Sequence, residues 1–69
     1  MNMSLKHNLE FCSNIEDYQS AFDNEVSRIR NMVLYKNDSE KLNRRIIRLK
    51  KDIEYIMSEN EIDGYLKVR

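Results

Sequence analysis

Apolar residues recur along the second half of the chain with the spacing of one side of an α-helix. Successive members of the series are four, three, four and three residues apart: Leu42, Ile46, Leu49, Ile53 and Ile56. This spacing keeps one side of a helix against a partner helix, and it predicts a helix over residues 40–58. Beyond it, Asn60 and Asp63 interrupt the apolar series and Gly64 is a plausible C-cap. Residues 59–69 are therefore expected to form a tail.

A second apolar pattern precedes this one and predicts a helix over residues 14–35. Ser13 and Glu16 have the spacing of a capping box, which marks a helix start. Residues 1–12 are expected to be a short helix, with Ser4 as its cap, or an arm. Along the first half of the chain the apolar residues follow three neighbouring lines: Leu5, Cys12, Val26 and Val33; Ile15, Phe22 and Ile29; Phe11, Tyr18 and Met32.

Residues 36–39, Lys-Asn-Asp-Ser, contain no apolar side chain, and the helical phase of the apolar pattern fails across them. Asn37 and Glu40 also have capping-box spacing. We therefore predict a turn at residues 36–39 and an all-α fold, an antiparallel two-helix hairpin formed by a single small domain of residues 1–69. One continuous helix with a phase shift is the alternative.

The three apolar lines of the first helix form an arc wider than one facing helix covers. Part of this arc is therefore expected to pack against another protomer or a larger protein, which would complete the core by dimerisation or partner binding. Folding of Phe11 and Tyr18 under the N-terminal arm is the alternative. The residues predicted to form this apolar partner surface are Phe11, Tyr18, Phe22 and Met32.

The composition favours the same class. A chain of 69 residues buries only about 60% of the surface that its unfolded state exposes, so its stability is marginal without further support. The single Cys12 excludes an intrachain disulfide, which leaves oligomerisation or a larger partner as the support. One Gly and no Pro provide too few turns for an all-β fold.

Positive charge is concentrated around the predicted turn. The chain has 12 basic and 12 acidic residues, but residues 26–51 hold nine basic and two acidic ones, a net charge of +7, which leaves −7 for the remainder. Helical spacing places five of the basic residues, here called the basic stripe, along one flank of the second helix: Lys41, Arg44, Arg45, Arg48 and Lys51. A solvated face, an acidic protein partner (including a second copy of this chain) and nucleic acid remain open as interpretations.

Catalytic and cofactor chemistry is not expected. His7 and Cys12 are five residues apart, about 140° round a helix, which does not favour a hydrogen-bonded dyad. One glycine excludes a Gly-rich phosphate loop, and no His and Cys cluster predicts a metal site. The N-terminus has no signal-peptide pattern and no stretch is apolar for about 20 residues, so we expect a cytoplasmic protein with no membrane partner.

In size and layout the chain resembles small two-helix adaptors and co-chaperones that hold a helical partner, and equally small plasmid or phage regulators that dimerise into helix bundles. This resemblance of architecture implies a small interaction module, namely an adaptor, chaperone or inhibitor of a larger protein, that acts by helix packing. A dimeric helical hairpin that binds RNA or DNA through the basic stripe is the alternative function.

Overall fold

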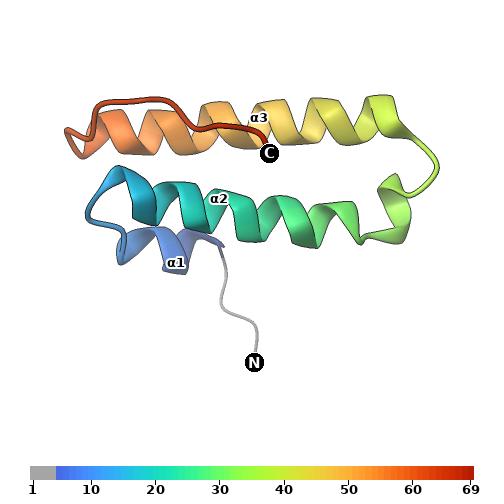
Figure 1. Ribbon diagram of the computed structural model, residues 1–69, viewed down its shortest axis with the longest axis horizontal. Coiled ribbons are helices and arrows are strands. Elements are labelled where there is room, and N and C mark those ends of the chain that lie inside the picture. The colour runs from blue at the N-terminus through green and yellow to red at the C-terminus, as the bar shows by residue number, and fades with distance from the viewer. Residues whose placement is uncertain (1–4) are drawn as a thin grey trace.

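The computed structural model describes residues 5–69 and shows an all-α protein, which confirms the predicted class. Its elements are α1 (Leu5–Glu10), α2 (Ile15–Arg30), the 3₁₀ turn η1 (Val33–Tyr35) and α3 (Ser39–Glu59). The predicted cap Ser4 lies outside the described residues. Figure 1 shows α2 and α3 side by side with opposite chain directions, α1 beside α2, and the C-terminal tail running back along α3. The molecule measures 37 × 27 × 17 Å.

The core lies between α2 and α3 and extends under α1 and the tail. Each helix presents residues three or four apart to its neighbour, as helical geometry requires. The buried residues come from α1, α2, α3 and the tail: Leu9; Tyr18, Phe22, Val26 and Ile29; Ile46, Leu49, Ile53 and Met57; and Leu66. The wide apolar arc of α2 is thus largely covered by other parts of the same chain.

Both long helices begin one residue later than the capping boxes in the sequence indicate. Asn14, and not Ser13, caps α2, because its Oδ1 accepts the backbone N–H of Asp17 at 2.9 Å. Ser13 instead donates its N–H and its hydroxyl to the Asp17 carboxylate, at 3.0 and 3.1 Å. At α3 the cap is Asp38, which accepts the N–H of Lys41 at 3.0 Å. The capping pattern is present at each start, but it is displaced by one residue.

The predicted helix over residues 14–35 is too long, because α2 ends at Arg30. Asn31 donates from its side-chain amide to the carbonyl of Ser27 at 3.0 Å, so a side chain satisfies one of the last helical carbonyls. Met32 then adopts an extended conformation with φ −76° and ψ 136°. The apolar pattern continues through Val33, but this side chain lies 85% exposed in η1. Apolar spacing alone therefore overestimated the helix.

α3 ends in a Schellman motif that reverses the chain. Ile62 donates its N–H to Met57 at 2.9 Å and Glu61 donates to Ser58 at 3.1 Å, which is the bond pattern of that motif. Glu61 has a φ of 61°, a left-handed conformation that glycine adopts at lower cost. Gly64 has a φ of 129°, and a Cβ at this position would lie 2.3 Å from Ile15 Cδ1. These two residues direct the tail back over the helices.

Candidate interaction surfaces

The outer face of α3 carries apolar and basic side chains together. We define this face by five residues that lie opposite the buried side of the helix: Arg44, Ile47, Arg48, Lys51 and Tyr55. Ile47 is 51% exposed and Tyr55 is 65% exposed. They follow one row with Lys51, four residues from each. The face therefore offers an apolar strip of two side chains, Ile47 and Tyr55, with Lys51 between them and further positive charge beside it.

Most of the basic stripe remains unpaired within the described part of the chain. Arg44 forms an ion pair with Glu40, one helical turn earlier, but both side chains are about three quarters exposed and such pairs contribute little. No ion pair forms within residues 5–69 for the others of the stripe: Lys41, Arg45, Arg48 and Lys51. The stripe thus keeps most of its positive charge available to an anionic partner.

Glu25 on α2, the acid whose pKa the charge of Arg45 in the stripe lowers, forms its ion pair with another residue. Its carboxylate accepts two hydrogen bonds from the Arg28 guanidinium, at 2.7 and 2.9 Å. This contact lowers the pKa of Glu25, with a smaller contribution from the positive charge of Arg45. α2 therefore supplies no acid that forms an ion pair with the stripe.

The four residues predicted for the apolar partner surface do not lie together. Tyr18 and Phe22 are buried in the core, so in this conformation they are unavailable to a partner. Phe11 is 71% exposed and makes an edge contact with His7, with 5.1 Å between ring centroids. Met32 is half-buried at the other end of α2. Coverage by α1 and the tail explains why the wide arc does not form one open surface.

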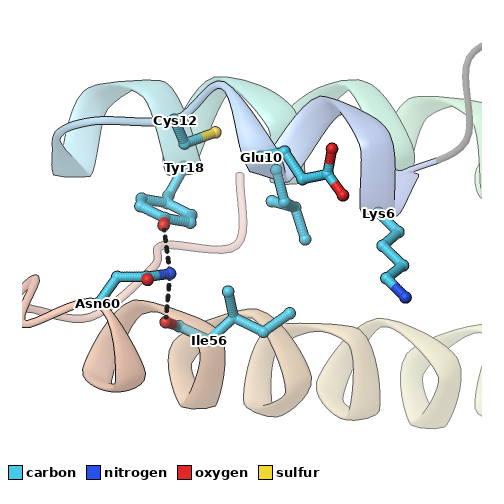
Figure 2. A pocket seen from close by; sticks show the side chains of 7 residues that line it. Lys6, Glu10, Cys12, Tyr18, Ile56 and Asn60 are labelled. Atoms are coloured by element: carbon cyan, nitrogen blue, oxygen red, sulfur yellow. Dashed lines mark hydrogen bonds between the residues drawn. The ribbon is translucent and has the colours of Figure 1, made fainter.

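A cavity of about 430 Å³ lies between α1 and the C-terminal end of α3. Figure 2 shows Tyr18 and Asn60 meeting across it, where the Asn60 amide donates to the tyrosine oxygen at 3.1 Å and to the Ile56 carbonyl at 3.0 Å. Burial, and then the nearby Asp17 carboxylate, raise the pKa of the Cys12 thiol at the edge of the cavity. The thiol is protonated at neutral pH, so it is a poor nucleophile. The cavity can accept apolar side chains.

The tail is held by hydrogen bonds to its backbone from side chains on two helices. Gln19 on α2 accepts the N–H of Lys67 and donates to the Lys67 carbonyl, both at 2.8 Å. Glu54 on α3 accepts the N–H of Leu66 at 2.8 Å. The Leu66 side chain is only 2% exposed. These contacts define a tail groove, formed by Gln19, Glu54 and the core beneath Leu66.

Glu54 also connects the tail to the positive charge of α3. Burial alone would raise the pKa of this carboxyl, but hydrogen bonds from Lys50, at 2.7 Å, and from the N–H of Leu66 lower it. Lys50 lies 5.9 Å from the centre of the Tyr65 ring. Gln19 and Glu54 were not among the predicted site residues, because their partners in the tail are distant along the chain.

Ile47 and Tyr55 were also absent from the predicted site. Ile47 follows Ile46 directly, so it falls outside the apolar series of α3, and Tyr55 precedes Ile56 in the same way. An apolar residue displaced from the buried side of a helix is a signal that identifies such positions. Both side chains are more than half exposed, in agreement with this reading.

Residues 5–69 show neither a metal-binding cluster nor a membrane-spanning helix. Among these residues no group of three or more His, Cys, Asp and Glu side chains could hold a metal ion. None of the described helices combines the length and apolar character that crossing a membrane requires. No protein-family model, no curated protein and no solved structure matches this chain.

Proposed function

We propose that this chain is a small non-enzymatic interaction module, acting as an adaptor, chaperone or inhibitor, that binds an acidic amphipathic helix of a larger protein. The binding surface is the outer face of α3. One observation carries the proposal: Ile47 and Tyr55 are exposed in one row with Lys51 and are flanked by Arg44 and Arg48.

Helix packing explains why these residue types belong together. Tyrosine and arginine are enriched among the residues that dominate binding energy in protein interfaces, and the contacts around such residues exclude water from them. Basic residues at the border accelerate encounter with an acidic partner and select against basic ones. In this account the antiparallel pair of α2 and α3 is the rigid support, and α3 is the helix that the partner contacts.

Charge reversal on the outer face provides the first test. Arg44→Glu with Arg48→Glu should reduce recovery of the partner from the native cell by at least about tenfold, while helix content by circular dichroism stays unchanged. Arg30→Glu with Lys36→Glu is the matched control, because both residues are exposed, the charge change is the same and neither lies on this face. Equal recovery with the two double variants would contradict the proposal.

The apolar strip provides a second test with no change in charge. Ile47→Ala and Tyr55→Ala should each reduce the free energy of binding to a helical protein partner by about 1 to 2 kcal/mol, a loss typical of an interface residue of moderate importance. Both side chains are exposed, so the free energy of unfolding should change little. Unchanged affinity in both variants would show that the partner is not bound by helix packing here.

A second copy of this chain is an alternative partner, because the residues outside 26–51, with their net charge of −7, could meet the basic stripe of another molecule. This arrangement would complete the core or extend it through dimerisation. Sedimentation equilibrium over a concentration series tests it, since a dimer forms by mass action. A constant monomer mass would exclude self-association over the range tested.

Nucleic acid is the second candidate, favoured by the four cations of the stripe that have no ion pair within residues 5–69. Neutralising about four phosphates would give log Kobs against log salt a slope of roughly −3.6. Ile47→Ala should then have no effect on affinity, in contrast to the protein-helix case. A shallow slope together with sensitivity to Ile47→Ala would exclude this candidate.

A further inference from the structure

We propose that the tail groove is a binding site for an extended, basic segment of a partner protein in which a leucine precedes a lysine or arginine. Residues 65–69 occupy it as an internal ligand, and a partner segment of the same chemistry displaces them. The proposal concerns a different surface from the outer face of α3, and it does not depend on the function proposed for that face.

The groove recognises the main chain of the tail at two consecutive residues. Gln19 contacts both the N–H and the carbonyl of Lys67, and Glu54 accepts the N–H of the preceding residue. Paired contacts of this kind fix the direction and register of an extended peptide whatever its sequence. Any segment that presents the same two consecutive residues in extended form satisfies Gln19 and Glu54 equally well.

The groove accepts a single side chain of the tail, that of Leu66. Leu66 is buried in the core, whereas its two neighbours Tyr65 and Lys67 are exposed. An extended chain presents alternate side chains to opposite sides, so one of two consecutive residues enters the groove. The groove therefore selects for an aliphatic residue at the position of Leu66 and tolerates many residues beside it.

An acidic side chain lies beside the basic end of the tail. Arg69 Nε lies 3.9 Å from the Asp23 carboxylate on α2, whereas the other carboxylate of the groove, that of Glu54, is already paired with Lys50. Beside Arg69 a cavity of about 250 Å³ continues along α2, with Phe22 and Val26 in its lining. A partner segment with a basic residue after the leucine would have the Asp23 carboxylate nearby.

Displacement is feasible because few contacts hold the tail. Residues 60–69 contain no helix, and the chain enters the groove through the left-handed residues Glu61 and Gly64. One buried side chain and the main chain of two residues provide most of the attachment. A competing segment that makes the same contacts binds with an apparent affinity equal to its intrinsic affinity multiplied by the fraction of molecules whose groove is vacant.

Binding of a labelled peptide to the full chain tests the proposal. The probe is Asp-Gly-Tyr-Leu-Lys-Val-Arg, the sequence of residues 63–69, with a fluorescent label, and the measurement is fluorescence anisotropy. Leu66→Asp in the protein should release its own tail, so this variant should bind the probe at least about tenfold more tightly than the unaltered chain. The same probe with aspartate in place of leucine should not bind.

Gln19→Ala supplies the control for main-chain recognition. Combined with Leu66→Asp in the protein, Gln19→Ala should reduce the affinity for the probe by about fivefold or more, because two hydrogen bonds to the probe are lost. Ser20→Ala, at the exposed neighbouring position, should leave the affinity unchanged. Equal affinity in the two combined variants would overturn the assignment of the groove.

A second variant tests the groove if Leu66→Asp does not fold. If Leu66→Asp abolishes the circular dichroism signal of the helices, Lys67→Pro takes its place, since proline removes the N–H that Gln19 accepts and leaves Leu66 intact. A folded variant with a released tail that fails to bind the probe overturns the proposal. A concentration-dependent dimer of the unaltered chain that either variant abolishes would assign the groove to a second copy, which overturns the choice of partner.

Discussion

Ile46 and Ile47 are identical, adjacent residues on α3 with opposite surroundings. Ile46 is 3% exposed and faces α2, whereas Ile47 is 51% exposed among the basic residues of the outer face. Adjacent helical positions differ by about 100° in direction, so position decides burial while residue type does not. The inner side of α3 therefore supports the fold. On the outer side, Ile47 is the same apolar side chain without a place in the core, and this difference is the basis of the proposed function.

Alanine at each position is the sharpest way to measure this difference. Ile46→Ala removes buried methyl groups and leaves a cavity, so the free energy of unfolding should fall by about 2 to 5 kcal/mol. Ile47→Ala should change it by no more than about 0.5 kcal/mol. Urea unfolding followed by circular dichroism compares the two. Equal losses would mean that Ile47 is also buried, and would contradict the difference between the two sides of α3.

The tail should behave as part of the inner core. Leu66→Ala should lower the free energy of unfolding by about 2 kcal/mol, at the low end for a buried leucine because the tail can readjust. Val68→Ala is the matched control, since that residue is about half exposed in the same segment. Chemical denaturation measures both variants. A negligible effect of Leu66→Ala would show that the tail is not docked in solution.

A substitution at the end of α3 should stabilise the protein. Glu61 adopts a left-handed conformation in which a Cβ is unfavourable, so Glu61→Gly should raise the free energy of unfolding by about 0.5 to 1 kcal/mol. Glu59→Gly, at the last helical position, should instead destabilise by up to about that amount. Thermal unfolding distinguishes the two. Destabilisation by both would contradict the Schellman motif at this position.

The smallest expected effect is a dependence on pH through Glu54. Because hydrogen bonds lower the pKa of Glu54 in the folded protein, its carboxylate contributes fully to stability above the unfolded pKa of about 4.3. This contribution disappears as the pH falls through the lower folded pKa. Glu54→Gln should therefore reduce stability at pH 7 and weaken its decline below about pH 4.5.

Exposed Glu59 provides the matched control for this pH effect. Glu59→Gln should leave the pH profile close to that of the unaltered chain, while Glu25, whose pKa is also lowered, contributes to the decline in all three proteins. Melting temperatures at pH 7, 5 and 3 provide the measurement. Parallel profiles for the two variants would show that the tail contact does not depend on the Glu54 charge.

The sequence predicted helical elements well where a long apolar series decides them. The spacing from Leu42 to Ile56 indicates a helix over residues 40–58, and α3 spans Ser39–Glu59. It failed at the end of α2, because the local hydrogen bond of Asn31 interrupts a pattern that remains apolar through Val33. Periodicity reports which side of a helix is apolar, and it does not report competition at the helix end.

The interaction surfaces were less predictable than the helices. The basic stripe follows from helical spacing, and all of its residues lie on α3 in the structure. Tyr18 and Phe22 have the same apolar character as a partner surface, but the tail and α1 cover them. The contacts of Gln19 with Lys67 join residues 48 positions apart, and no local pattern indicates them.

Site-specific photocrosslinking tests the central claim that partners bind the outer face of α3. A photoreactive phenylalanine analogue in place of Tyr55, in the cells that naturally make this chain, should form one predominant adduct that nuclease treatment leaves intact. The same analogue in place of Ser20, an exposed position on α2, is the control and should give little of that adduct. Arg44→Glu with Arg48→Glu should abolish the Tyr55 adduct. Equal crosslinking from both positions, or an adduct that survives the charge reversal, would contradict the account.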